Sequence, residues 1–263
     1  MAEGADPYHN AVEAVRAMGG MERFVKKGEV VVVKPNMAWD RAPEYAANTD
    51  PEVVAAVVEM CYKAGAKRVN VFDIPCNDAR RVYDSSGISK AAKAKGAYVY
   101  YADDWNTVSA HFPYSSMMEG WPVLRDALEC DTFINVPVLK DHRLARLTLS
   151  MKNLMGVCGG NRGKMHTDIG EKLVDMADFI YPDLNIIDAT RVLIKNGPIG
   201  GNLEDVKRMD KVIVSTDTTL ADTYACGLVD VEPSTLPNIK AALKRGFGKA
   251  DLTKADIKTI RLS

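Results

Sequence analysis

The sequence predicts an α/β fold with a doubly wound, mainly parallel sheet and helices on both of its faces. Short runs of β-branched residues alternate along the chain with segments whose apolar residues recur at helical spacing. Helices between successive strands require right-handed crossovers, which build parallel sheets covered on both faces. The 263 residues contain no long linker and no internal repeat, so we expect a single domain over residues 1–263.

The first strand–helix–strand unit illustrates the pattern. Residues 30–33 are four consecutive valines, which is typical of a buried strand. Asp50 can cap a helix whose first position suits Pro51, and apolar residues then recur at helical spacing until Gly65 ends the helix. Residues 68–72 follow as the next strand. The unit therefore predicts two parallel strands joined by one helix.

The later segments repeat this alternation of helices and strands. The predicted helices are residues 88–95, 122–129, 144–155, 167–179, 218–228 and 236–244, and the predicted strands are residues 97–101, 132–136, 184–187, 211–214 and 257–261. Residues 144–155 carry apolar side chains on most faces of the predicted helix, so we expect this helix to be largely buried.

The composition is that of an ordinary globular chain. Hydrophobic residues make up 47 % and charged residues 26 %, proportions that exclude a disordered protein. A formal net charge of −1 argues against a dedicated nucleic-acid binder. The sequence has no stretch of roughly 20 apolar residues and no basic start followed by an apolar core. We therefore expect a cytoplasmic protein without a membrane partner, or an exported one if a leader was removed.

The cysteines indicate which cofactors not to expect. The five cysteines are scattered, and no two have the spacing of a C-x-x-C pair. An iron–sulfur cluster, a structural zinc site and a disulfide framework are therefore not expected, and the cofactor stays open.

Polar side chains follow most of the predicted strands. In open parallel sheets, ligands bind beyond the carboxyl ends of the strands. Because the carboxyl ends of parallel strands meet at one edge of the sheet, we expect these groups to lie together there. An aspartate at such a position can simply cap a helix N-terminus, but a lysine cannot. The residues concerned are Lys34, Asn36, Asp73, Lys140, His142, Asp188, Ser215 and Asp217.

Two further signals lie between residues 144 and 166. Lys152 and Asn153 interrupt the apolar segment, and they either line a pocket or, for the lysine, offset the helix dipole and reach water. The Gly-rich segment GVCGGNRGKMH that follows contains Arg162 and His166, a combination suited to binding an anion. The pattern is not a nucleotide-binding loop, and a flexible surface loop would also explain it.

Several of these segments together resemble a known family. They are KPN (34–36), TDPEVV (49–54), AGAKRVNVFD (64–73), INVPVLKDH (134–142), TLSMKNLMG (148–156), Arg162, His166, IIDA (186–189) and NGPIGG (196–201). Over about residues 30–229 the chain resembles the family called domain of unknown function 362. The resemblance implies the α/β fold and the candidate site, and it implies an association with iron–sulfur proteins because many members carry a ferredoxin module. This chain lacks the cysteine runs of that module, and the family implies no settled reaction.

Three functions fit these observations. In the first, the chain is an enzyme that acts on a small anionic metabolite. The carboxylate or phosphate groups of the metabolite are held by Lys34, Lys140, Lys152 and Arg162. His142 or His166 transfers protons, and Asn36 and Asn153 orient the metabolite. In the second, the chain is a non-catalytic binding or assembly protein that serves iron–sulfur or redox enzymes, with a redox protein as its partner. In the third, His142, His166 and an aspartate hold the metal of a hydrolase or lyase.

Overall fold

A mixed, mostly parallel sheet forms the centre of the molecule. The computed structural model describes all residues except 114, 116 and 263. Within these residues, ten strands form one sheet with the order β12-β1-β11-β10-β7-β2-β3-β4, to which β8 and β9 add beside β10. The central strands that pair in parallel are β2 (Val30–Pro35), β3 (Arg68–Val71), β4 (Tyr98–Val99), β7 (Thr132–Val136) and β10 (Leu184–Leu193). The predicted α/β fold is thus confirmed.

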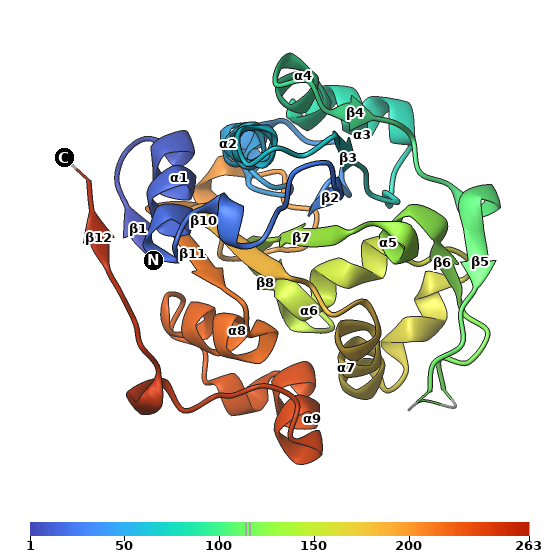
Figure 1. Cartoon of the computed structure of the whole chain (residues 1–263). Helices are drawn as coiled ribbons and strands as arrows, with labels where there is room; N and C mark the ends of the chain where they lie inside the picture. Colours follow the sequence, from blue (N-terminus) through green and yellow to red (C-terminus); the bar gives the residue numbers. More distant parts are fainter. Residues whose placement is uncertain (114, 116, 263) are drawn as a thin grey trace.

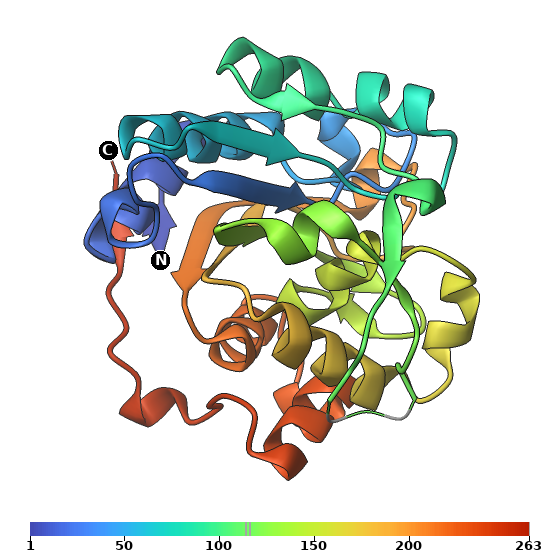
Figure 2. The same ribbon diagram turned by 45° about the vertical axis from the view of Figure 1, so that its right-hand side comes forward.

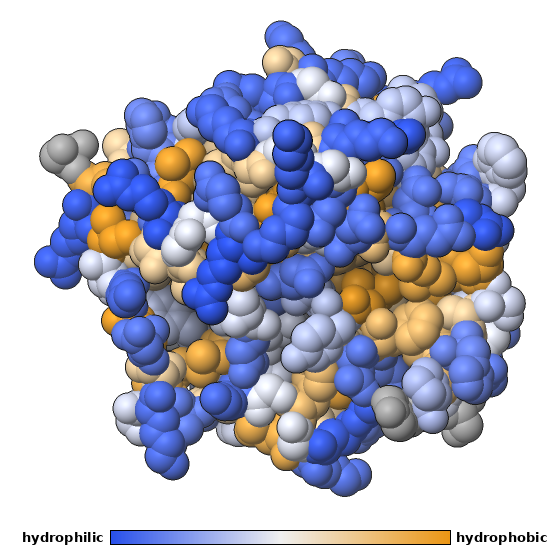
Figure 3. Space-filling model, viewed as in Figure 1, coloured by the Kyte–Doolittle hydropathy of each residue, from blue (hydrophilic) through white to orange (hydrophobic). Residues whose placement is uncertain are grey.

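Helices cover both faces of this sheet (Figures 1 and 2). On one face lie α1 (Pro7–Ala17), α2 (Pro51–Lys63), α3 (Ala79–Ser85) and α4 (Ile88–Ala94), and on the other lie α5 (Arg125–Glu129), α6 (Ser150–Asn153), α7 (Ile169–Ile180), α8 (Thr218–Gly227) and α9 (Pro237–Arg245). Successive strand side chains point to opposite faces, so Val31 and Val33 belong to one hydrophobic cluster and Val32 to another. Hydrophilic residues cover most of the face in Figure 3.

Several predicted elements are present as expected. Helix α2 begins where the sequence indicates, because the Asp50 side chain accepts a hydrogen bond from the Glu52 amide at 2.9 Å and Pro51 takes the first helical position. Other elements are shorter than predicted: only residues 98–99 of the strand at 97–101 and residues 260–261 of the strand at 257–261, β12 (Ile260–Arg261), pair in the sheet. In the predicted helix at 122–129, the first three residues form β6 (Pro122–Leu124), which pairs with β5 (Thr107–Ser109).

The prediction of one helix over residues 144–155 is wrong. The chain instead forms β9 (Arg146–Thr148), the short helix α6, and a 3-10 turn over residues 154–157. Leu147 and Leu149 pack into one hydrophobic cluster, whereas Met151 and Leu154 pack into another. Because the apolar side chains of this segment pack into two different clusters, their spacing does not separate a strand followed by a turn from a helix.

Two groups of polar residues do not follow parallel strands as predicted. Strand β8 (Val138–His142) pairs antiparallel with β9, so Lys140 and His142 lie on a strand and not in the loop after one. Strand β11 (Val206–Ser215) runs antiparallel to β10, and Ser215 pairs with Asn185 near the start of β10. Ser215 and Asp217 therefore lie at the opposite edge, where Asp217 caps α8 by accepting a hydrogen bond from the Leu220 amide at 2.9 Å. Strand β1 (Ala2–Glu3) pairs antiparallel with β11, with Ala2 opposite Val212.

Candidate functional site

A cavity of about 630 Å³ lies where β2, β3 and β8 meet α6 and the segment 154–166. Nine of the twelve candidate residues from the sequence line it; Ser215 and Asp217 lie at the opposite edge, and Asp188 lies within β10. Its charged and polar lining comprises Lys34, Asn36, Asp73, Cys76, Lys140, His142, Arg143, Thr148, Lys152, Asn153, Arg162 and His166. Among the described lining residues Asp73 is the one carboxylate, so five lysine and arginine side chains face a single acidic group and the cavity is strongly cationic.

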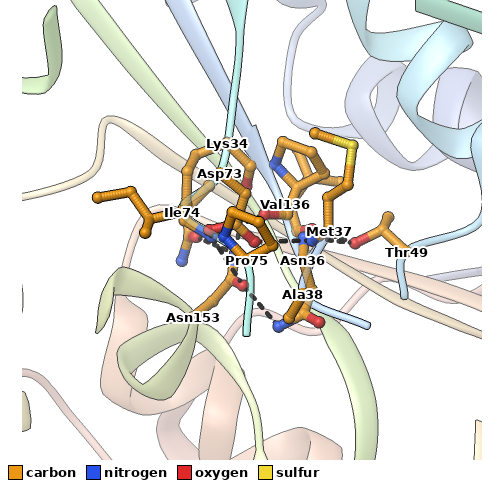
Figure 4. Close-up of polar contacts among 12 residues, drawn as sticks. Lys34, Asn36, Met37, Ala38, Thr49, Asp73, Ile74, Pro75, Val136 and Asn153 are labelled. Atoms are coloured by element: carbon orange, nitrogen blue, oxygen red, sulfur yellow. Dashed lines mark hydrogen bonds and ion pairs between the residues drawn. The ribbon is translucent and has the colours of Figure 1, made fainter. Parts of the chain in front are cut away.

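The ends of β2 and β3 bring Lys34 and Asp73 together. Their side chains, 0 % and 2 % exposed, form an ion pair with 2.8 Å between Nζ and Oδ1. The Lys34 ammonium also donates to the Pro35 carbonyl at 2.7 Å, and the second Asp73 oxygen accepts from the Met37 amide at 2.7 Å (Figure 4). Burial lowers the pKa of Lys34, and the nearby Asp73 carboxylate opposes this shift. Both side chains are thus fixed before any ligand arrives.

Asparagine side chains connect these groups across the floor of the cavity. The Asn36 amide group donates to Asn153 Oδ1 at 3.0 Å, and Asn153 donates in turn to Asn135 Oδ1 at 2.9 Å. Asn135 continues the chain by donating to Asn185 at 2.9 Å. Because each amide has a defined donor and acceptor side, this network fixes the orientation of Asn36 and Asn153, the two amides that line the cavity.

Lys140 is held at the other end of this network. Its ammonium, 1 % exposed, donates to Asn36 Oδ1 at 3.0 Å and to the Ala47 carbonyl. Both acceptors are neutral, so no carboxylate compensates the buried charge directly. Burial is the main reason why the pKa of Lys140 is lowered to about 7; Cys76 and Asp73 oppose this shift, and the Lys152 and Lys34 charges add to it. Lys140 therefore titrates near neutral pH.

Lys152 reaches the cavity from α6. This helix is short, and the buried Asp222 carboxylate on α8 anchors its start by accepting from the Ser150 amide at 2.7 Å and the Met151 amide at 3.2 Å. Within residues 1–113, 115 and 117–262 the Lys152 ammonium has no hydrogen-bond or ion-pair partner. Burial lowers its pKa to about 8, and the Arg162 and Lys34 charges act in the same direction. The side chain is thus oriented by its helix and available to a ligand.

Gly156 allows the turn after α6 to approach the ion pair. A Cβ atom at this position would lie 1.8 Å from Asp73 Oδ1 and 2.6 Å from Lys34 Nζ. Any side chain here would therefore collide with the ion pair, and glycine is required by space and not by backbone conformation.

The two predicted histidines stack on each other. The rings of His142 and His166 have centroids 6.2 Å apart and planes inclined by 22°. Burial, with the nearby Lys152 and Lys140 charges, lowers the pKa of His142 to about 3. Burial and Lys152 also lower the pKa of His166. Both rings are therefore neutral around pH 7, the state in which an imidazole offers one N–H donor and one lone-pair acceptor.

Arg162 connects the glycine-rich segment to the loop after β3. Its guanidinium donates to the Ile74 and Pro75 carbonyls, each at 2.7 Å, so its position on the cavity wall is fixed. The same loop carries Cys76, an exposed thiol on the cavity wall. A guanidinium stays charged in proteins, so Arg162 adds to the cationic field of the cavity.

Asp188 is the predicted site residue that the structure places elsewhere. It lies within β10, which continues to Leu193, and not at the end of a strand. Its carboxylate accepts hydrogen bonds from the Asp50 amide at 2.7 Å and from the Thr190 hydroxyl at 2.6 Å. Burial, together with the neighbouring Asp50, raises the pKa of Asp188 to about 6. Asp188 therefore stabilises the start of α2 and does not line the cavity.

The comparison with protein families agrees with the resemblance in the sequence. The model of the family described as "Domain of unknown function (DUF362)" matches residues 31–227. The chain belongs to this family. A family relative, the thylakoid-associated protein sll1697 of Synechocystis sp., is 30 % identical over 255 residues, which are 90 % of this chain and 74 % of the relative.

A solved structure shares the fold. The lactate racemase apoprotein from Thermoanaerobacterium thermosaccharolyticum superimposes with a TM-score of 0.56 at 10 % sequence identity. The match covers 86 % of this chain but only 56 % of the racemase, so the chain spans little more than half the length of that enzyme. At this identity the comparison establishes the α/β architecture, in a fold that also occurs in an enzyme of small-molecule metabolism.

A membrane-spanning helix and a metal site were the two remaining features to look for in the described residues. No helix among them is long and apolar enough to cross a membrane. No three His, Cys, Asp or Glu side chains in the same part of the chain lie together in a way that would hold a metal ion. Asp73, the one carboxylate among the described lining residues, pairs with Lys34.

The sequence analysis missed three lining residues. Trp39 lies four residues beyond the end of β2, Cys76 lies five residues beyond the end of β3, and Arg143 follows β8 directly. A search that included a few more residues after each predicted strand would have identified Trp39 and Cys76. Arg143 was overlooked because β8 was not predicted as a strand.

Proposed function

We propose that the cavity is the active site of an enzyme that acts on a small metabolite carrying a carboxylate or phosphate group. The excess of cations over carboxylates in its lining supports the proposal most directly. Lys140 and Lys152 face the cavity without a carboxylate partner, so a bound anion would supply the charge that their burial lacks. Lys34, Lys140, Lys152 and Arg162 are the residues that we expect to hold the anion.

The hydrogen bonds of the two histidines support a role in proton transfer. The Nδ1 atom of His142 accepts from the Leu144 and Ala145 amides, both at 3.2 Å, so its proton lies on Nε2. The Nδ1 atom of His166 lies 3.2 Å from the Gly163 carbonyl, which can only accept, so Nδ1 carries the proton and Nε2 holds a lone pair. One ring thus offers a donor and the other an acceptor. In this proposal His142 polarises a substrate carbonyl or carboxylate oxygen and His166 removes a proton.

The likeness to lactate racemase suggests which anions to test first. Short hydroxy acids such as D- and L-lactate belong to the first panel, followed by dicarboxylates and phosphate monoesters. Proton transfer at a carbon next to a carboxylate would fit the pairing of one donor with one acceptor histidine. Exchange of that carbon-bound hydrogen for deuterium in D₂O, followed by NMR, is the activity readout.

Binding is tested by calorimetry with the wild type, Lys152→Ala and the control variant Lys90→Ala. Lys90 is an exposed lysine on α4 that does not line the cavity. We expect at least one anion to bind the wild type and Lys90→Ala equally, and Lys152→Ala to bind it at least tenfold more weakly. Failure of every anion to bind, or equal binding by all three proteins, would refute the assignment of this site.

A second candidate, the non-catalytic partner protein, is favoured by the description of the 30 % identical relative as thylakoid-associated. It predicts reproducible capture of one protein partner and no exchange or turnover of any anion. The cytoplasmic location that the sequence suggested stays a prediction, which fractionation of cells into membrane and supernatant would test.

A further inference from the structure

We propose that Lys152 is a nucleophile, whose amine attacks the carbonyl carbon of an oxo acid bound in the cavity and forms a Schiff base. The inference rests on the proposed function, because it uses the same cavity and takes the carbonyl-bearing members of the same class of anions. It adds a covalent step and a substrate class, the oxo acids, to a site otherwise defined only by its charge.

The first argument is that the three lysines of the cavity differ in what they contact. Lys34 is occupied by its ion pair with Asp73 and by the Pro35 carbonyl. Lys140 is 1 % exposed and donates to Asn36 and Ala47, so its nitrogen is enclosed. Lys152 lines the cavity with no partner in the described part of the chain. Its amine is therefore the one that a substrate in the cavity could reach without breaking an existing contact.

The second argument concerns the charges around Lys152. An amine must be unprotonated to attack a carbonyl, and an ordinary lysine is almost entirely protonated at pH 7. Burial lowers the pKa of Lys152 to about 8; Cys76 and Asp73 oppose this shift, and the positive charges of Arg162 and Lys34 add to it. With that pKa about a tenth of the amine is neutral at pH 7, roughly 300-fold more than for a lysine in water. The same cations attract the carboxylate of an oxo acid.

The third argument is that the proton carriers that the reaction needs are present. Lys152, His142 and His166 line the same cavity, and the two histidine rings stack on each other. Schiff-base formation begins when the amine nitrogen bonds to the carbonyl carbon and the carbonyl electron pair moves to oxygen. The nitrogen then loses a proton to His166 Nε2, which passes it to the carbonyl oxygen held by the His142 Nε2–H hydrogen bond. The second proton of the nitrogen follows the same route, and the hydroxyl leaves with it as water, so amine and ketone give imine and water.

The cavity can also hold the rest of an oxo acid. Arg162 and Arg143 lie on its wall and offer guanidinium donors for a carboxylate. Apolar side chains, including Trp39, Leu144 and Ile199, line the same cavity and suit the carbon portion of such a molecule. An oxo acid with a short apolar chain therefore fits both parts of the lining.

Reductive trapping tests the proposal. The protein is incubated with pyruvate, 2-oxoglutarate or acetoacetate and then reduced with sodium borohydride, which converts an imine into a stable secondary amine. We expect intact-mass spectra to show one adduct with the mass of the oxo acid less one oxygen atom, and peptide mapping to place it on Lys152. Lys152→Arg keeps the positive charge but cannot form an imine, so we expect it to lose at least nine-tenths of the adduct. Lys90→Arg serves as the control and should be labelled like the wild type.

Parallel measurements separate this proposal from the proposed function. Oxalate and phosphate have no ketone, so their binding reports on the cationic cavity alone, and we expect Lys152→Arg to bind them within about threefold of the wild type, since its charge is kept. If these anions bind but no oxo acid is trapped, or if the adduct persists in Lys152→Arg, the Schiff-base proposal is wrong and the anion site stands. If no anion binds at all, the proposed function itself fails.

Discussion

Replacing Gly156 by alanine tests how closely the candidate site is packed. The new methyl group would lie 1.8 Å from Asp73 Oδ1 and 2.6 Å from Lys34 Nζ, both far inside contact distance. Asp73 cannot move away freely, because its other oxygen accepts from the Met37 amide at 2.7 Å. The methyl group must therefore separate the buried ion pair, and breaking such a pair costs about 3–5 kcal/mol. We expect Gly156→Ala to lower the free energy of unfolding by about 3 kcal/mol.

Gly227 provides a matched control. It ends α8, is exposed, and has no atom within 4 Å of the position a Cβ would take. Gly227→Ala should leave the stability unchanged or raise it by up to about 1 kcal/mol, since alanine favours a helix. Urea denaturation followed by circular dichroism measures both variants. If Gly156→Ala unfolds within about 0.5 kcal/mol of Gly227→Ala, the ion pair is not as tightly enclosed as we infer.

Three further predictions concern single side chains of the cavity. Lys152→Met should raise the free energy of unfolding at pH 7 by up to about 3 kcal/mol, because it removes a charge that burial disfavours. Between about pH 8 and 10.5 the folded wild type binds fewer protons than the unfolded chain, so its stability rises with pH. Urea denaturation at pH 10 should therefore show a smaller difference in stability between the variant and the wild type. The His142 ring should show no protonation by NMR between pH 8 and 5, and a titration near pH 6.5 would contradict its inferred environment. Cys76 should react first with a thiol reagent because Cys61, Cys158 and Cys226 are buried, and Cys76→Ser should remove the fast phase.

The sequence predicted the candidate site well where strands are parallel neighbours. Strands β2 and β3 pair in register, Val33 opposite Val71, so the residues that follow them necessarily meet. That is why Lys34 and Asp73 could be placed together from two separate strand ends. The prediction needed only the direction of the strands and not their order in the sheet.

The sequence did not predict sites that depend on strand length or on turns. Asp188 seemed to follow a strand because residues 184–187 are the apolar start of β10, but the strand continues for six residues in which polar and apolar side chains are mixed. Lys152 was expected on a long helix and lies on a short one, because Arg146 adopts a positive φ of 67° and the chain turns back before α6. Such changes of direction leave no periodic signal. That residues 1–263 form one domain stays a prediction.

The charge of the cavity explains why its lysines have shifted pKa values and why a ligand should change them. Lys140 and Lys152 have no carboxylate partner, and burial favours their uncharged forms more strongly than the nearby Cys76 and Asp73 oppose it. A bound carboxylate or phosphate reverses this preference, because it offers the negative charge that the protein does not supply. Binding of an anion near pH 7 to 8 must then be accompanied by uptake of protons, and its affinity must fall as pH rises through this window. A structural role for the two lysines would require partners that neutralise them, and the described part of the cavity places its one carboxylate on Lys34.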